Sequence, residues 1–293
     1  MTILNRVEDG LATLEFSRPE RKNALNQAMY ELLVRGLERA AADDDVRAVL
    51  ITGQPGVFTA GNELTEFLAN PDSLSPDAPV IRFMLALARF EKPVVAAVTG
   101  HAVGIGVTLL LHCDFVYVAD GARLSMPFVK LGLVPEFAAS LLVPMRAGHV
   151  RAAEMLMLGT PISAEEAVQM GLANMAVPEE QVIDVAREAA RRFQALPAGA
   201  VAETKRLMKR ARGCLVEEAI GIVYLNKARR PIAAVTRRVL DDLERMNARL
   251  PAAQAIPVPR EAALARAIAR RIAQMDPWEV DRERWGRRIA DMR

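Results

Sequence analysis

The chain contains a glycine turn, Gly104-Ile105-Gly106, between an apolar run typical of a strand and one typical of a helix. A turn of this kind leaves the first N–H groups of the helix without intrahelical partners, and the helix dipole favours negative charge there. Leu109 replaces the third glycine of a dinucleotide-binding fingerprint, and no Gly-Lys-Ser/Thr follows to complete a phosphate-binding loop. The turn therefore indicates either a site that stabilises negative charge or close packing of a strand on a helix.

A second turn of small residues lies in the segment Phe58-Thr-Ala-Gly-Asn-Glu-Leu64, again between a buried strand and the start of a helix. Two such turns after neighbouring strands can direct two backbone N–H groups at one point. Paired N–H donors are what an enolate or a tetrahedral oxyanion requires. The two turns together predict an oxyanion-binding site.

The segments that must position these turns alternate between β-like and helical patterns. Strands are predicted over residues 11–16, 47–53, 94–100 and 115–119. Helical spacing recurs between them, at Met29, Leu32, Leu33 and Leu37 and again at Phe83, Leu87 and Phe90. Strands that alternate with helices predict an α/β layer architecture with parallel pairing.

The second half of the chain is mostly helical in pattern, apart from a β-like run at 173–177. Ser163 and Glu166 form a capping box and Gly171 supplies a C-terminal cap, which predicts a helix from 164 to 170. Further helices are predicted over 179–196 and 199–212. A Pro-rich break near 250–259 precedes a basic helical segment, 260–293, that carries both tryptophans.

These motifs, taken together, resemble the crotonase (enoyl-CoA hydratase/isomerase) superfamily. Residues 58–64 resemble its first oxyanion motif and residues 92–106 its second. Residues 18–25 resemble the start of its coenzyme A site, and residues 160–171 resemble its Ala-x-x-x-Gly-Leu stretch. The resemblance covers roughly residues 11–207, about two-thirds of the chain.

The resemblance implies a crotonase-like α/β fold, a spiral of ββα turns with a helical C-terminal region. The corresponding division is an acyl-CoA-binding core over 1–197, a helical oligomerisation region over 198–250, and a Pro-rich linker with a basic terminal helix over 251–293. A homotrimer or hexamer and an acyl-CoA thioester substrate are expected.

By position, the resemblance assigns the two oxyanion N–H groups to Asn62 and Ile105. It places the coenzyme A contacts at Lys22, Ala24, Leu25, Ala60, Gly61 and Gly104. Glu63, the acid beside Asn62, is expected to have a structural role. No cofactor other than coenzyme A, as part of the substrate, is implied.

No metal site is expected either. The two cysteines and three histidines are too few and too scattered for a thiolate zinc site or an HExxH helix. His112 and Cys113 follow three leucines and are predicted as packed interior residues rather than as a nucleophile and its base.

The hydratases of the family use two glutamates, and the corresponding positions here are Thr108 and Phe128. Two carboxylates are needed to hold and polarise a water molecule, one as base and one as acid. Simple hydration is therefore disfavoured.

Residues 126–136 instead resemble the Δ3,Δ2-enoyl-CoA isomerase branch, which carries a single catalytic glutamate after a Leu-Gly-Leu stretch. Glu136 matches that glutamate, and its sequence neighbours are apolar. An apolar pocket suits a carboxylate that must take and return one proton. Phe137 follows where the isomerases have a small residue, and it is expected either to narrow the acyl tunnel or to re-aim the carboxylate.

The reaction so predicted is the shift of a double bond from position 3 to position 2 of an enoyl-CoA, in fatty-acid oxidation. Glu136 removes a proton from C2 and returns it to C4. Two alternatives stay open: another crotonase-type reaction such as weak hydration, and a catalytically weak acyl-CoA-binding or interaction protein.

Charge is divided unevenly along the chain. Residues 1–204 carry 17 basic and 25 acidic side chains, a net charge of −8, whereas residues 205–293 carry 21 basic and 11 acidic side chains, a net charge of +10. The acidic body makes a nucleic-acid partner unexpected, and the basic end indicates either a contact with phosphates or a solvated helical face.

The longest stretch without a charged residue, 93–113, is interrupted by glycines and by His101, so no membrane span is expected. An acid, Glu8, lies where a signal peptide needs its apolar run. A cytoplasmic protein is therefore expected.

Overall fold

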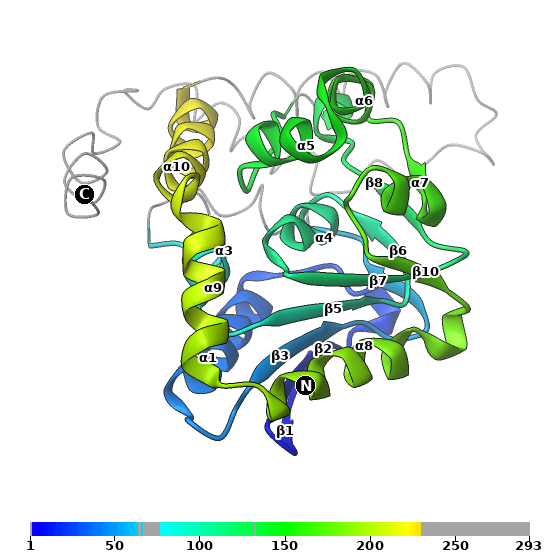
Figure 1. Ribbon diagram of the computed structural model, residues 1–293. Coiled ribbons are helices and arrows are strands. Elements are labelled where there is room, and N and C mark those ends of the chain that lie inside the picture. The colour runs from blue at the N-terminus through cyan, green and yellow to red at the C-terminus, as the bar shows by residue number, and fades with distance from the viewer. Residues whose placement is uncertain (1, 64–65, 67–76, 132, 230–293) are drawn as a thin grey trace, which may run out of the picture.

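The computed structural model describes residues 2–63, 66, 77–131 and 133–229, and it has the predicted α/β architecture (Figure 1). A six-stranded sheet has the order β1 (Ile3–Glu8), β2 (Leu11–Phe16), β3 (Ala48–Thr52), β5 (Val94–Val98), β7 (Phe115–Ala119), β10 (Met175–Val177). β1 and β2 are antiparallel, and the other neighbours are parallel. A second sheet has the order β4 (Gly56–Thr59), β6 (Gly100–Val103), β8 (Arg123–Ser125), β9 (Ile162–Ser163).

The central strands β3 and β5 are buried along their whole length, and all their residues except Thr52 are apolar, because other elements cover both of their faces. On one face, Leu50 and Val95 pack with Ala186 of α8 (Val182–Arg191), which lies beneath the sheet in Figure 1. The opposite face, with Val49 and Ala96, belongs to the main core. α1 (Gln27–Ala42) and α3 (Pro79–Arg89), which contact each other, contribute to that core.

The remaining helices are α4 (Ile105–Thr108), α5 (Ala139–Ala147), α6 (His149–Ala153), α7 (Ala164–Gln169), α9 (Ala198–Arg210) and α10 (Gly213–Arg229). The predicted capping box is confirmed in α7, where the Ser163 hydroxyl accepts from the Glu166 N–H and the Glu166 carboxylate accepts from the Ser163 N–H. Gly171 then takes a left-handed conformation, φ +67°, just beyond the helix.

All five strands predicted from the sequence are present. Four described strands that the pattern did not indicate, β4, β6, β8 and β9, form the second sheet, and β1 was also missed. Each strand of the second sheet has only two to four residues. Runs so short do not develop a recognisable alternation, so their pairing depends on the fold around them.

Two predicted helices are shorter than the sequence indicated. After Gly104 the helix makes one turn, α4, and continues as a 3-10 turn over Leu109–His112 before the chain enters β7. The helix predicted over 179–196 has 3-10 turns at Glu179–Gln181 and Arg192–Ala195 on either side of α8. The helical pattern does not separate α from 3-10 geometry at helix ends.

The C-terminal part that the structure describes ends in α10, which contacts α3 and α5. Its Val216 and Ile220 are buried in the main core. The predicted linker and terminal helix after residue 250, with both tryptophans, lie outside the described residues, so the division of the chain stays a prediction.

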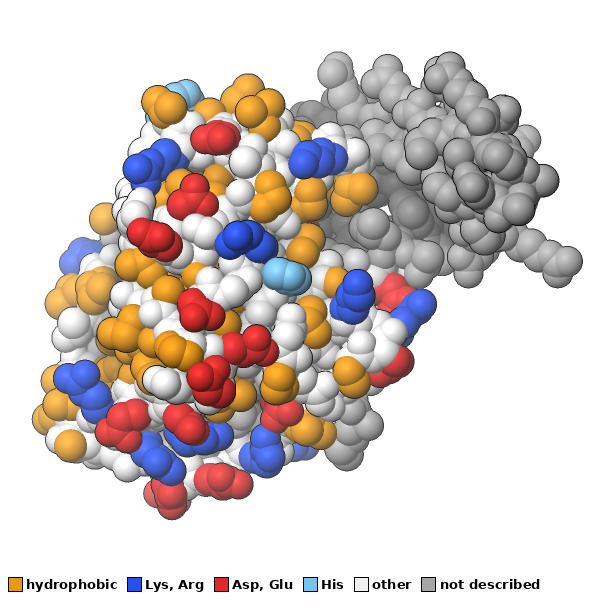
Figure 2. Space-filling model, turned by 90° about the vertical axis from the view of Figure 1, so that its right-hand side faces the viewer, with side chains coloured by type: hydrophobic (Ala, Val, Ile, Leu, Met, Phe, Trp, Pro, Cys, Tyr) orange, Lys and Arg blue, Asp and Glu red, His pale blue; other side chains and the backbone are white. Residues whose placement is uncertain are grey.

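The face shown in Figure 2 carries acidic and basic side chains interspersed with hydrophobic ones. Several large apolar side chains are exposed around α5 and α6, namely Met145, Val150, Met157 and Leu158. None of the helices in the described part of the chain is long and apolar enough to cross a bilayer.

Candidate active site

β4 and β6 are parallel neighbours, so the two predicted turns, which follow their carboxyl ends, lie side by side at the same end of the small sheet. They are in direct contact at Gly61, which has φ +89°, because a Cβ atom added there would lie 2.8 Å from the carbonyl oxygen of Val103 and 3.9 Å from Cα of Gly104. Gly106 packs as closely, since its Cβ would lie 2.4 Å from the Thr59 methyl group. Only glycine fits at either position, so the turns serve close packing as well as any role in binding.

The N–H groups of Asn62 and Ile105 make no backbone hydrogen bond to another described residue. Asn62 lies in a single parallel bridge, in which Leu25 donates to Gly61 O at 2.8 Å and accepts from Glu63 N at 2.8 Å. Ile105 is the first residue of α4, and its buried side chain belongs to the main core. Both N–H groups are therefore available to a ligand.

Glu136 is 1% exposed, and its carboxylate accepts a hydrogen bond from the side-chain amide of Asn62, Nδ2 to Oε1, at 3.4 Å. The Asn62 Oδ1 atom accepts in turn from the hydroxyl of Tyr30, a buried residue of α1. Burial, with the neighbouring charge of Glu136 adding to it, raises the pKa of Tyr30 well above its ordinary value. Tyr30 is therefore a neutral donor, and its hydroxyl orients the Asn62 amide with its NH₂ group toward Glu136.

Sequence reasoning missed both Tyr30 and the side chain of Asn62. A role for Tyr30 was only weakly indicated by the sequence, because it is a tyrosine that follows Met29, one of the apolar residues at helical spacing in α1. Glu136 lies two residues before the first capping position of the following helix, α5. Ala138 is the N-cap of α5, and no side chain caps that helix.

The two positions of the hydratase glutamates also lie at or near this site. Phe128 faces the second turn, since its Cε1 atom is 4.0 Å from where a Cβ of Gly104 would lie. Thr108 is buried, and its hydroxyl reaches only the carbonyl of Ile105, at 3.5 Å. A hydrocarbon ring and a short hydroxyl thus occupy positions where hydration requires carboxylates.

The segment predicted to contact coenzyme A, residues 22–25, runs beside the first turn. The Ala60 N–H donates to Lys22 O at 2.9 Å, next to the Leu25–Gly61 contact. The Ala24 carbonyl accepts from Arg18 at 3.0 Å. The backbone of this segment is fixed, while the side chain of Lys22 is exposed.

Asn23 holds that segment in place. Its side chain is fully buried, donates to the carbonyls of Val57 and Phe58 at 3.2 and 3.1 Å, and accepts from the Arg18 N–H at 2.8 Å. Asn23 has a positive φ of 54°. An asparagine tolerates this left-handed conformation better than most residues, which accounts for its presence in the motif.

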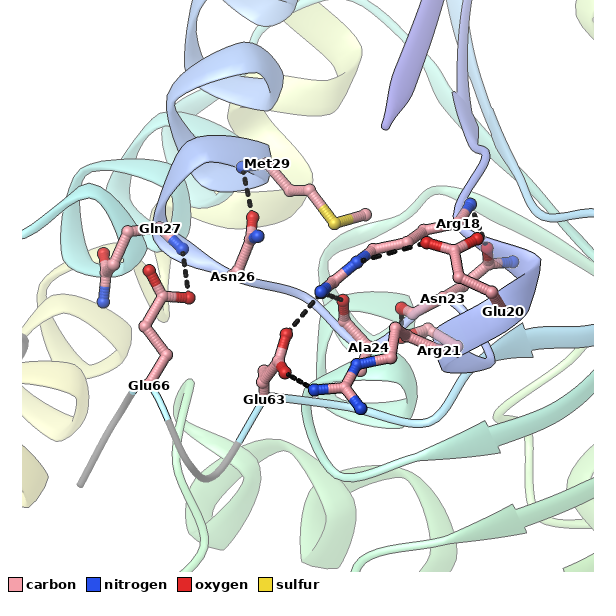
Figure 3. A network of polar contacts seen from close by, with 11 residues as sticks. Arg18, Glu20, Arg21, Asn23, Ala24, Asn26, Gln27, Met29, Glu63 and Glu66 are labelled. Atoms are coloured by element: carbon pink, nitrogen blue, oxygen red, sulfur yellow. Dashed lines mark hydrogen bonds and ion pairs between the residues drawn. The ribbon is translucent and has the colours of Figure 1, made fainter. Parts of the chain in front are cut away.

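Glu63 links the two segments, as Figure 3 shows. Its carboxylate accepts from the guanidinium groups of Arg18 and Arg21, the latter at 2.6 Å. The hydrogen bond from Arg18, followed by that from Arg21, outweighs the effect of burial and lowers the pKa of Glu63. Glu63 is thus an ionised acceptor that ties the turn to the coenzyme A segment, which agrees with the structural role expected for it.

His112 and Cys113 are buried, as predicted. Burial lowers the pKa of His112 to about 3 and raises the pKa of Cys113 to about 12. A thiol with that pKa is no nucleophile at neutral pH. In the described part of the chain, no three His, Cys, Asp or Glu side chains gather closely enough to hold a metal ion.

A cavity of about 270 Å³ lies elsewhere, between α9, α10 and the Leu111–Asp114 segment. Its walls include Lys205, Lys209 and His112, and none of the residues predicted to bind or transform substrate lines it. Burial lowers the pKa of Lys209 to about 8. The cavity therefore does not belong to the turns around Asn62 and Ile105.

Comparison with known proteins agrees with this arrangement. The profile of the family Enoyl-CoA hydratase/isomerase matches residues 6–220. The chain is 37% identical over 204 residues to the 1,2-epoxyphenylacetyl-CoA isomerase of Escherichia coli K12, covering 67% of this chain and 77% of that protein. It is 34% identical over 215 residues to human enoyl-CoA delta isomerase 2, covering 71% of this chain but only 54% of the human protein.

Among solved structures, the Pseudomonas aeruginosa protein OdaA superposes with a TM-score of 0.74 and 51% identity, over 76% of this chain and 90% of OdaA. This match shows that the two sheets and their helices form the same fold as a protein of known structure. Together with the profile match over most of the chain, it shows that this protein belongs to the enoyl-CoA hydratase/isomerase family.

Proposed function

We propose that the protein is an acyl-CoA isomerase that moves the double bond of a 3-enoyl-CoA to position 2. One observation carries the proposal: Glu136, the one carboxylate buried within the described part of the chain, contacts Asn62, whose own N–H lies at the first turn. Family membership supports an acyl-CoA thioester as the substrate.

In the proposed reaction, the thioester oxygen accepts from the N–H groups of Asn62 and Ile105. This interaction stabilises the negative charge that develops on the oxygen when a proton leaves C2, and each donor contributes about 3 kcal/mol. Glu136 takes that proton and returns it to C4 of the resulting dienolate, so one carboxylate acts first as base and then as acid. Its burial keeps water away from the proton it carries.

The residues at the two positions of the hydratase glutamates support isomerisation over hydration. Thr108 and Phe128 offer no group that could activate water, and Phe128 presents its ring to the second turn. A dienolate at this site is therefore reprotonated on carbon and does not meet an activated water molecule.

Coenzyme A is proposed to lie along residues 22–25 and the first turn. The contacts are those assigned above to Lys22, Ala24, Leu25, Ala60, Gly61 and Gly104, with coenzyme A as part of the substrate rather than as a resident cofactor. A homotrimer or hexamer in the cytoplasm, acting in fatty-acid oxidation, completes the proposal.

A second candidate is isomerisation of an epoxide of phenylacetyl-CoA. The relative in Escherichia coli, which is named for that activity, favours it. The same oxyanion N–H groups and the same single carboxylate would serve both substrates.

The test compares the wild type with Glu136→Gln, which keeps the shape of the side chain and removes the proton acceptor. Conversion of a 3-enoyl-CoA is followed by the ultraviolet absorbance of the conjugated product, in parallel with conversion of 1,2-epoxyphenylacetyl-CoA. Glu188→Gln, an exposed change on α8, is the matched control. We expect kcat of Glu136→Gln to fall by about 10²–10⁴-fold, the contribution of a positioned proton transfer, with nearly unchanged affinity for the acyl-CoA.

If Glu136→Gln keeps more than about a tenth of the wild-type kcat, the base lies elsewhere and the proposal is wrong. If the wild type converts the epoxide but no 3-enoyl-CoA, the second candidate replaces the first.

A further inference from the structure

Two consecutive residues after Glu136 have a left-handed backbone. Phe137 has φ +53° and Ala138 has φ +58°. Side chains with a Cβ atom rarely adopt this conformation, and Phe137 is bulky as well. Such a pair persists only where the surrounding structure holds it in place.

His112 makes the contact that can hold this pair. Its Nε2 atom lies 2.9 Å from the carbonyl oxygen of Phe137. The two rings are stacked, with centroids 3.8 Å apart and planes at 17°. Phe83 of α3 contacts the Phe137 ring from another side, edge-on, at 6.2 Å between centroids. The ring of Phe137 is fully buried among these partners.

The hydrogen bond has a defined direction. A carbonyl oxygen can only accept, so Nε2 of His112 carries the hydrogen and donates it. Burial lowers the pKa of His112 to about 3. The hydrogen bond to the Phe137 carbonyl acts in the opposite direction, and the positive charges of Lys209, Arg146 and Arg212 lower the pKa further. The imidazole is therefore uncharged near neutral pH, and the hydrogen bond does not depend on pH in that range.

The position of His112 in the chain gives this contact a consequence for the site. His112 ends the 3-10 turn that continues from α4, and α4 begins at Ile105. One short stretch therefore carries a predicted oxyanion N–H at its start and holds the backbone after Glu136 at its end. The cavity described above is lined by His112 but not by Phe137 or Glu136.

We infer that His112 is a positioning residue for Glu136: its hydrogen bond to the Phe137 carbonyl and its stacking on the Phe137 ring keep residues 137 and 138 left-handed, and this backbone turns the carboxylate toward Asn62 and the two oxyanion N–H groups. The inference rests on the proposed role of Glu136 as the base. It also accounts for the phenylalanine after Glu136, whose buried ring stacks on His112.

The test uses the full-length chain and the 3-enoyl-CoA assay. His112→Gln keeps an N–H donor near the position of Nε2, whereas His112→Asn keeps an amide but cannot place it there. His112→Leu removes the donor and keeps apolar volume. We expect kcat to fall by about ten-fold or more in His112→Leu and His112→Asn, since a small misplacement of a catalytic group is costly, with KM within about two-fold. His112→Gln is expected to retain most of the activity.

A rescue separates positioning from general damage to the core. Ala138→Gly introduces the residue that adopts a left-handed backbone without strain. When Ala138→Gly is added to His112→Asn, kcat is expected to rise several-fold above that of His112→Asn alone. A purely structural role of His112 would not predict this rise. Thermal unfolding of every variant identifies any that fails to fold. If His112→Leu does not fold, the inference is tested by comparing kcat of His112→Gln with kcat of His112→Asn, both of which introduce a polar amide.

Equal kcat in His112→Gln and His112→Asn, or no gain from Ala138→Gly, would overturn the inference. The Glu136→Gln variant distinguishes this failure from a failure of the proposed function. If Glu136→Gln is inactive while both His112 variants match the wild type, only the role of His112 is wrong. If Glu136→Gln remains active, the proposed base and the inference fall together.

Discussion

The side-chain amide of Asn62 donates to the carboxylate of Glu136 across 3.4 Å, and the backbone N–H of the same asparagine, at the adjoining turn, makes no hydrogen bond to another described backbone group. One residue therefore joins the proposed base to a proposed oxyanion donor. A thioester oxygen bound to that N–H would bring its α-carbon toward the carboxylate. At 3.4 Å the amide–carboxylate contact is long for a hydrogen bond, so an entering substrate displaces it at little cost.

We expect Gly61→Ala to abolish most activity, because the added methyl group would lie 2.8 Å from Val103 O and push the two turns apart. Gly56→Ala is the matched control: its φ of +86° is as unfavourable as the +89° of Gly61, but nothing lies within 4 Å of the added atom. Measuring kcat and the thermal unfolding of both variants distinguishes the effect of the Gly61–Val103 contact from the strain of a positive φ at a non-glycine residue. Equal losses in the two would show that the contact between the turns is unimportant.

Tyr30→Phe is expected to lower kcat several-fold and to destabilise the protein by about 0.5–1.5 kcal/mol, because the part-buried Asn62 Oδ1 atom would lose the hydrogen bond from Tyr30. The measurement is kcat together with urea unfolding. Tyr117→Phe, a change on β7 away from Asn62, serves for comparison and should leave kcat unaltered. A Tyr30→Phe variant with wild-type kcat would mean that the amide orientation does not matter for Glu136.

We expect hydration of a 2-enoyl-CoA to become measurable only after Thr108→Glu and Phe128→Glu are introduced together. The reason is that neither position now carries a carboxylate, and Phe128 faces the second turn. Formation of the 3-hydroxyacyl-CoA is measured by chromatography, with each single variant as a control. Efficient hydration by the unmodified protein would contradict the single-base assignment and require an acid–base pair not yet identified.

The stability of the protein should fall in acid partly through Glu63. Its pKa is lowered in the folded state by the hydrogen bonds from Arg18 and Arg21, whereas the pKa of a glutamate in the unfolded chain is about 4.3. Because the folded pKa is the lower one, this stabilisation is complete above the unfolded pKa and is lost as the pH falls through the folded pKa.

Urea unfolding at several pH values between about 3 and 7 measures that loss. Glu63→Gln should be less stable than the wild type near neutral pH and should approach it in acid. Glu188→Gln, an exposed change, controls for the general effect of losing a carboxylate. A constant difference between Glu63→Gln and the wild type at every pH would show that the ion pairs make no net contribution.

Local patterns in the sequence determined a large part of this protein. The central strands are almost entirely apolar runs, and the capping box at Ser163 and Glu166 defines the start of α7 from four consecutive residues. The glycine turn at Gly104 also precedes a helix, as the sequence indicated, although the strand directly before it, β6, was not predicted. Each of these features depends on neighbours within about one helical turn or one strand, which is why they are readable without the fold.

Tertiary structure alone decided how the candidate site is assembled. Tyr30, Asn62 and Glu136 are far apart in the chain and meet only because α1, the turn after β4 and the segment before α5 pack together. The same holds for His112 and the left-handed Phe137, since a positive φ in a bulky residue contradicts local preference and needs a distant partner to hold it. The sequence could propose an acid and locate the two turns, but the direction of each side chain follows from packing between elements, which no local pattern contains.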